Sequence, residues 1–292
     1  MTRFLNKLTT KNVMIVFLLN FFFAILEFIF GFLFNSAAIL SDAVHDSGDV
    51  IAIGLAWFFQ KLSKRKEDSH FSFGYQRFSL LGALITSVIL ITGSLIVCLT
   101  TFPRLFNPQQ IKASGMLFLA IFAILANLFG AYLLARGHSR NESILNLHAL
   151  EDVLGWLAVL IISIVLHFEP WYWLDPLLSI LISAFILSKA IPKFIGTLKI
   201  LLEATPLELN YSELRAKIEE LPEVRNVTQL NIWSIDGEEN AVLLHLTIPE
   251  AQDFSATKSA VRKLFISYKV CQCAIELDET VKEHKTHPIY QK

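Results

Sequence analysis

The sequence is short of charged residues and of cysteine, and both shortages limit what the protein can be. Only 17% of its 292 residues are Asp, Glu, Lys or Arg, and three are Cys. Three cysteines are too few for a disulfide framework, and Cys271 and Cys273 are too close for an easy intrachain bridge, which favours a reducing compartment for this part of the chain. Neither part of the chain is strongly basic, so we expect no nucleic-acid partner.

Hydrophobic residues dominate instead, making up 54% of the chain and including 24 Phe. They gather in six apolar stretches of about 20 residues, the length with which an α-helix crosses roughly 30 Å of hydrocarbon. The first stretch lacks a small-residue cleavage site, so we expect it to stay in the protein. The sequence therefore predicts an all-α transmembrane bundle of six helices, over residues 13–34, 38–60, 78–102, 113–135, 144–167 and 173–195.

The charged residues divide the chain near residue 200. The first 200 residues hold 15 of the 25 basic and 11 of the 26 acidic side chains, and the last 92 hold the rest. Within the first part, Lys and Arg gather at alternate connections, for example around Lys64 and Arg140, whereas the opposite connections hold almost only Arg104 and Lys112. The positive-inside rule then predicts that both termini and the charged tail are cytoplasmic.

From Pro206 onward the pattern changes to that of a small globular domain. Residues 211–221 and 255–268 read as helices, whereas residues 224–235, 241–249 and 271–277 read as strands. This order, αββαβ, predicts a two-layer α+β domain. We therefore predict two domains: a six-span transmembrane domain over residues 1–205 and a cytoplasmic C-terminal domain over residues 206–292.

Ionisable residues inside the predicted spans indicate function, because each costs at least about 2.5–3.5 kcal/mol to insert. The second and fifth spans each hold a His followed four residues later by an Asp, namely His45 with Asp49 and His148 with Asp152. Residues four apart share one helix face, so each pair can aim at a common point. Two such helices packed face to face would supply a tetrahedral ligand set for Zn²⁺. The alternative is that each pair is a polar clamp between helices.

Three further acidic residues lie beside these pairs. Asp46 and Glu151 are each one residue, roughly 100°, from the liganding faces, so they could attract cations at the cavity mouth or orient a ligand. Asp42 lies nearly one turn before His45 and could hold its imidazole. Because His and Asp bind metal in their deprotonated forms, such a site can exchange metal for protons. This favours a metal/proton exchanger over a permanently bound structural metal.

Short motifs also occur in a distinctive order along the chain. They include Ser41-Asp42-Ala43, Phe73-Gly74-Tyr75, Leu81-Gly82-Ala83, Asp175-Pro176 and Ile232-Trp233-Ser234. This ordered set resembles the cation diffusion facilitator family of zinc transporters over nearly the whole chain.

The resemblance carries several implications for function. In the family, the positions matching His45, Asp49, His148 and Asp152 form the transport site, and the His-plus-Asp version is associated with zinc over manganese or iron. The resemblance also implies a homodimer in the lipid bilayer and an exchange of cytoplasmic metal for inward protons. It further implies a ferredoxin-like tail that helps to dimerise and can sense metal.

Weaker metal candidates lie outside the spans. Asp68 and His70 are the available ligands for a second site in the loop between spans two and three, with a solvated loop as the alternative. In the tail, residues 229–231 read Gln-Leu-Asn where the family often has Asp-Leu-His, so two ligands are missing. His245 remains, and with Cys271 and Cys273 it could form a replacement regulatory zinc site. Half-buried cysteines and a strand histidine are the alternative.

We therefore predict a secondary active exporter and no enzyme, specifically a Zn²⁺/H⁺ antiporter that moves zinc outward by alternating access. The same machinery could carry Co²⁺, Cd²⁺ or Ni²⁺. An intramembrane zinc hydrolase would need an HExxH motif, which is absent, and a metal sensor without transport would need only the tail. We expect no organic cofactor, and the compact loops without a long His-rich segment favour a bacterial inner membrane.

Overall fold

The computed structural model describes residues 2–135, 140–250 and 253–282, and the chain forms two compact units. The first unit contains residues 1–58 and 82–194, and the second contains residues 59–81 and 195–292. The loop between the second and third long helices thus belongs to the same unit as the C-terminal domain. The predicted domain boundary at residue 205 stays a prediction.

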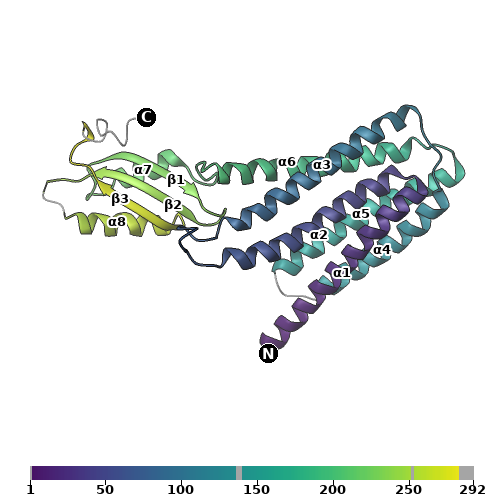
Figure 1. The fold of residues 1–292 in the computed structure, drawn as a ribbon, viewed down its shortest axis with the longest axis horizontal. Coiled ribbons are helices and arrows are strands. Elements are labelled where there is room, and N and C mark those ends of the chain that lie inside the picture. Colours follow the sequence, from purple (N-terminus) through teal and green to yellow (C-terminus); the bar gives the residue numbers. More distant parts are fainter. Residues whose placement is uncertain (1, 136–139, 251–252, 283–292) are drawn as a thin grey trace. The chain divides into compact units, whose positions relative to one another are not determined.

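Long helices account for most of the first 201 residues (Figure 1). Five helices of the described chain are long and apolar enough to cross a membrane, which confirms the predicted helical membrane bundle in its general form. The predicted second span also forms a helix, but Asp42, Asp46 and Asp49 reduce its hydropathy, so a sixth span stays a prediction. The long helices are α1 (Thr2–Phe34), α2 (Ala37–Ser63), α3 (Phe78–Phe106), α4 (Ala113–Ala135), α5 (Arg140–Phe168) and α6 (Leu174–Leu201).

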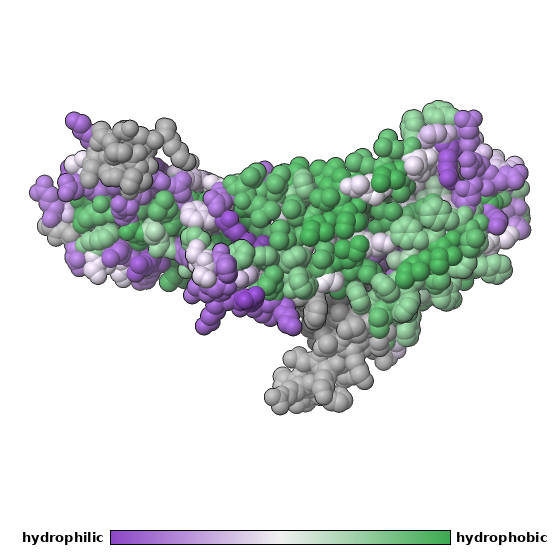
Figure 2. Space-filling view, viewed as in Figure 1, coloured by the Kyte–Doolittle hydropathy of each residue, from purple (hydrophilic) through white to green (hydrophobic). Residues whose placement is uncertain are grey.

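The surface of the helical unit is mostly hydrophobic, as the space-filling view shows (Figure 2). Large apolar side chains point outward along the helices, among them Leu99 and Phe118, which are 75% and 73% exposed. A water-soluble protein rarely exposes an apolar surface of this extent. The surface therefore fits contact with lipid.

The helices pack around a small buried core and through close backbone contacts. Trp156 of α5 packs edge-on against Phe23 of α1, with ring centroids 5.7 Å apart, and both rings are buried with Ala120 of α4. Between α2 and α3, a Cβ added at Gly48 would lie 2.2 Å from Leu90 Cδ2. Small residues allow membrane helices to approach in this way, and here they position α2, which carries the candidate site.

A buried carboxylate joins the beginnings of α2 and α6. Asp175, in the first turn of α6, accepts hydrogen bonds from Ser36 Oγ at 2.5 Å, Ala37 N at 2.7 Å and Ala38 N at 3.3 Å. The first N–H groups of a helix have no hydrogen-bond partner within the helix. A negative charge at this end also interacts favourably with the helix dipole. Asp175 therefore caps α2 from a distant part of the sequence and fixes where that helix begins.

The C-terminal domain has the predicted element order, α7 (Tyr211–Glu219), β1 (Asn226–Ser234), β2 (Asn240–Thr247), α8 (Phe254–Ile266) and β3 (Val270–Leu277). The sheet order is β1-β2-β3, in which β1 and β2 form an antiparallel hairpin and β3 runs parallel to β2 after the α8 crossover. Leu214 of α7 and Phe265 of α8 pack with Leu244 of β2 in one buried core. This confirms a small α+β domain, whereas a ferredoxin-like fold in the strict sense stays a prediction.

Candidate metal transport site

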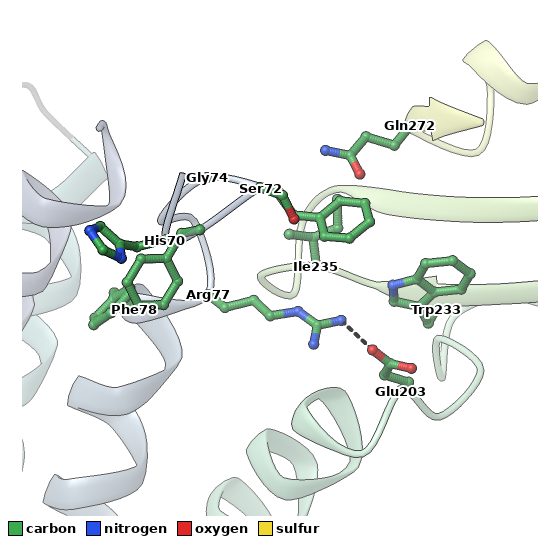
Figure 3. A pocket seen from close by; sticks show the side chains of 11 residues that line it. His70, Ser72, Gly74, Arg77, Phe78, Glu203, Trp233, Ile235 and Gln272 are labelled. Carbon is green, nitrogen blue, oxygen red and sulfur yellow. Dashed lines mark hydrogen bonds and ion pairs between the residues drawn. The ribbon is translucent and has the colours of Figure 1, made fainter. Parts of the chain in front are cut away.

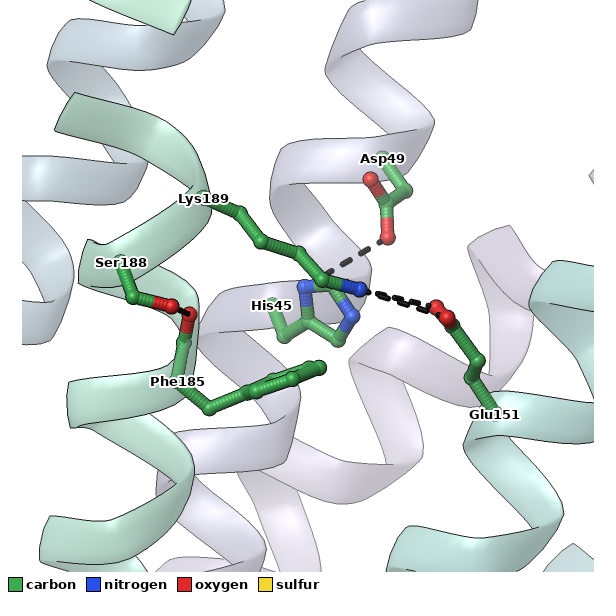
Figure 4. A network of polar contacts seen from close by, with 6 residues as sticks. All are labelled: His45, Asp49, Glu151, Phe185, Ser188 and Lys189. Carbon is green, nitrogen blue, oxygen red and sulfur yellow. Dashed lines mark hydrogen bonds and ion pairs between the residues drawn. The ribbon is translucent and has the colours of Figure 1, made fainter. Parts of the chain in front are cut away.

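The first predicted pair lies on one face of α2, one helical turn apart. His45 Nδ1 and Asp49 Oδ2 are 3.6 Å apart, and their side chains are 22% and 26% exposed (Figure 4). The distance is too long for a hydrogen bond and suits two groups that bind one small cation between them. The exposed part belongs to the rest of each side chain, because His45 Nδ1 and Asp49 Oδ2 themselves are buried in the bundle.

The second predicted pair lies on α5, where the structure describes only half of it. Asp152 is buried, with 8% of its surface exposed, and the side chain of His148 lies outside the described residues. Among the described side chains, no group of three or more His, Cys, Asp or Glu residues is arranged to hold a metal ion. The four-residue site formed by His45, Asp49, His148 and Asp152 therefore stays a prediction.

Acidic side chains from three helices surround this region of the bundle. Glu27 of α1 is fully buried, and Asp42 and Asp46 of α2 are each 7% exposed. The carboxyl group of Glu27 lies close enough to those of Asp46, Asp42 and Asp152 to interact with them electrostatically. Asp46 is thus enclosed between helices rather than open at a cavity mouth. An acidic interior of this kind attracts cations.

A lysine that sequence patterns did not single out also reaches this region. Lys189 of α6 places its Nζ 3.3 and 3.2 Å from the two carboxylate oxygens of Glu151 on α5 (Figure 4). The signal available in the sequence was a charged residue within an apolar stretch, which is a functional candidate by default. What the sequence could not indicate was its partner, because the two residues lie 38 positions apart.

The loop candidates Asp68 and His70 lie in the second unit. Asp68 Oδ2 accepts a hydrogen bond from the Tyr75 hydroxyl at 2.7 Å, and its Oδ1 accepts from the N–H groups of His70 and Phe71 at 2.9 Å each. The Tyr75 hydroxyl, followed by these N–H groups, holds the pKa of Asp68 below its usual range. Both carboxylate oxygens thus stabilise the loop itself, which favours the alternative of a structural loop, and a metal site here stays a prediction.

His70 also lines a cavity of about 340 Å³ within this unit (Figure 3). Arg77 crosses the cavity, and its Nη2 lies 3.0 Å from Glu203 Oε1. Trp233 of β1 and Gln272 of β3 complete the wall on the side of the sheet. The contacts join the loop to the C-terminal domain in one compact unit.

The tail candidates do not come together as one site. His245 pairs with Glu276 across the parallel strands, whereas Cys273 pairs with Val242 on the opposite face, since neighbouring residues of a strand alternate between faces. His245 is 1% exposed and lies between two carboxylates, with Nδ1 3.4 Å from Asp278 Oδ1 and Nε2 3.6 Å from Glu276 Oε2. The grouping of His245 with Cys271 and Cys273 is therefore corrected, because the strand register places Cys273 on the face opposite to His245, and the described residues hold no group of three such ligands.

Cys271 is expected to react slowly with thiol reagents. Partial burial of the sulfur, a hydrogen bond to the Glu239 carboxylate and the charge of that carboxylate raise the pKa of Cys271 to about 11. At pH 8 only about one thiol in a thousand is then ionised, and the thiolate is the reactive form. Alkylation by iodoacetamide should therefore be much slower in a Cys98→Ser/Cys273→Ser variant than for a free cysteine peptide, and Glu239→Gln should accelerate it. A rate equal to that of the peptide would contradict the raised pKa.

Known proteins resemble the chain along most of its length. The family profile described as the cation efflux transmembrane domain matches residues 13–202. A cadmium, cobalt and zinc/H(+)-K(+) antiporter of Bacillus subtilis (strain 168) is 31% identical over 264 residues, which cover 89% of this chain and 85% of that protein. The zinc transporter ZitB of Yersinia pestis is 29% identical over 282 residues, covering 95% and 90%. The metal cation efflux system protein CzcD of Cupriavidus metallidurans is 26% identical over 264 residues, covering 86% and 84%.

A bundle of apolar helices that encloses a His–Asp pair among buried carboxylates, followed by a small α+β domain, defines a class of membrane cation transporters. The family profile covers more than half of the chain, and this decides to which family the chain belongs. This chain belongs to the cation efflux family, also known as the cation diffusion facilitators.

Proposed function

We propose that the protein exports divalent metal cations and that Zn²⁺, exchanged for protons, is its main cargo. The observation that carries this proposal is the His45–Asp49 pair on α2, inside a bundle whose interior also holds Asp152. Membership of the cation efflux family and relatives named for zinc transport and for cadmium, cobalt and zinc antiport support it. Two pairs, His45 with Asp49 and His148 with Asp152, form the transport site in this proposal.

The chemistry of these ligands explains how export can be coupled to protons. Imidazole and carboxylate bind Zn²⁺ only when deprotonated, so protons and metal compete for the same four groups. If the bundle opens the site to one side at a time, metal leaves on one side and protons return through the same groups. No resident cofactor is required, because the metal is the cargo.

The same site can bind other divalent cations. Affinity for nitrogen and oxygen ligands rises along the first-row metals to Cu²⁺ and falls again at Zn²⁺, so affinity does not by itself select zinc and discrimination must come from geometry. Co²⁺ and Cd²⁺ are the second candidates, because a relative with 31% identity is named for them. Ni²⁺ is a further candidate cargo, supported only by the chemistry of the ligands.

The finer architecture belongs to the same proposal. We infer that α2 is the sixth span, because an acidic, histidine-bearing helix can cross a membrane when its polar face lines a cavity. We also infer cytoplasmic termini from the distribution of Lys and Arg, a ferredoxin-like domain after residue 205, a homodimer, and a bacterial inner membrane as its location. Regulatory binding of zinc by the C-terminal domain is part of the proposal only for His245, not for the cysteines.

Reconstitution tests the proposed function directly. The purified chain in liposomes loaded with a pH-sensitive dye should move protons when a Zn²⁺ gradient is applied, and protein-free liposomes should not. Zinc movement without proton movement would contradict the exchange, and no zinc movement would contradict the transport. The same measurement with Co²⁺, Cd²⁺ and Ni²⁺ ranks the cargo.

A further inference from the structure

An ion pair joins α5 to α6 and involves the residue directly before the proposed ligand Asp152. Lys189 Nζ lies 3.2 and 3.3 Å from the two carboxylate oxygens of Glu151, so the ammonium group contacts both oxygens (Figure 4). The same nitrogen lies 4.2 Å from the centre of the Phe185 ring, one turn earlier on α6. These contacts hold the ammonium group in one position from two directions.

The position of Lys189 in its helix makes this arrangement unusual. It lies 15 residues after the beginning of α6 at Leu174, and the whole helix is apolar enough to cross a membrane. At 1.5 Å per residue, the lysine is roughly 22 Å along the helix, within the thickness of the hydrocarbon layer. Charged residues at such depth are costly and face a cavity or a partner when present, so they mark ion pathways.

The surroundings of the pair explain what it faces. Glu151 directly precedes Asp152, one of the proposed ligands, on α5. Figure 4 draws the Lys189–Glu151 ion pair in the same view as the His45–Asp49 pair of α2, each with its own contact. Both members of the ion pair are about half exposed, at 53% each. The pair is therefore accessible, and its positive charge is held by the residue that directly precedes the proposed ligand Asp152.

We propose that Lys189 is a tethered cation that weakens metal binding at the transport site, with Glu151 as the residue that holds it in place. This inference rests on the proposed function, since it concerns the affinity of the same site. A positive charge near a divalent cation is repulsive, and the repulsion is stronger inside a bundle than in water. A transporter must bind its ion strongly enough to load it and weakly enough to release it. The positive charge of Lys189 weakens binding enough to allow release of the metal.

The test is metal binding by the full-length protein, measured by calorimetric titration of Zn²⁺ into the purified chain in detergent. Lys189→Met removes the positive charge and leaves Glu151 uncompensated, so the affinity for Zn²⁺ should rise about tenfold. Glu151→Gln leaves the ammonium uncompensated, so the affinity should fall by a similar factor. Lys189→Arg should stay near the wild-type value. Lys199→Met, in the exposed last turn of the same helix, is the matched control.

The opposite changes in Zn²⁺ affinity expected for Lys189→Met and Glu151→Gln distinguish an electrostatic effect of Lys189 from a purely structural role of the ion pair. If the pair only ties α5 to α6, both variants should change the affinity in the same direction, which would overturn the tethered cation. Unchanged affinity in both variants would overturn it as well, while the transport site itself would stand as long as Asp49→Ala abolishes binding. In liposomes, Lys189→Met should lower both the KM and the maximal rate of zinc transport, because tighter binding delays release.

Discussion

Asp49→Ala should abolish zinc-driven proton movement in liposomes, with a loss of at least about 100-fold. Changes in residues that only orient metal ligands already cost about 10–100-fold in affinity or activity, and the loss of a ligand should exceed this range. Asp49 lies 3.6 Å from His45 on the same helix face, so its removal leaves one neutral ligand on α2. Asp152→Ala and His148→Ala should have effects of similar size, since a tetrahedral zinc site has four ligands and no spare one.

A matched control separates loss of the site from loss of the fold. Ser47→Ala, two residues from Asp49 on α2, removes a polar group of the same helix outside the proposed ligand set and should transport normally. The Asp49→Ala protein should keep the oligomeric state and the melting temperature of the wild-type protein. Transport at the wild-type rate in Asp49→Ala would show that the site lies elsewhere.

Asp175→Ala should strongly destabilise the helical unit, because it leaves three hydrogen-bond donors without their acceptor. Asp175 is 1% exposed and accepts hydrogen bonds from Ser36 Oγ and from the N–H groups of Ala37 and Ala38. Hydrogen bonds to a charged group contribute about 1.5–3 kcal/mol each in proteins, although bonds inside membranes average less. We expect the free energy of unfolding to fall by about 2–4 kcal/mol, and the melting temperature in detergent should show it.

Two further variants test this explanation. Ser36→Ala removes only one of the three donors and should cost a fraction of the Asp175→Ala effect. Glu169→Gln changes an exposed acidic residue in the neighbouring connection and should leave the melting temperature unchanged. An Asp175→Ala protein as stable as the wild type would mean that α2 does not depend on this cap.

Local patterns made much of the architecture predictable. Hydrophobic stretches of spanning length indicated the helical bundle, and the order αββαβ of the tail could be read from the change in periodicity after Pro206. The proximity of His45 and Asp49 was equally predictable, because residues four positions apart in a helix are neighbours whatever surrounds them.

The tail shows where such reasoning fails. His245 and Cys273 both lie on strands, and their side chains could share a face or lie on opposite faces depending on the register. The observed pairing of His245 with Glu276 puts them on opposite faces, and a shift of one residue would have reversed the result. Nothing in the separate strands indicates their register.

The sequence by itself determined the membrane helices, the small C-terminal domain, the His–Asp pair of α2 and the resemblance to a family of cation transporters, because each depends on residues close together in the chain. Only the tertiary structure decided that Glu27 faces Asp46, that Asp175 caps α2 and that Lys189 pairs with Glu151. These contacts join different helices, and helix packing depends on the shapes of whole faces, such as the close approach at Gly48, rather than on local spacing.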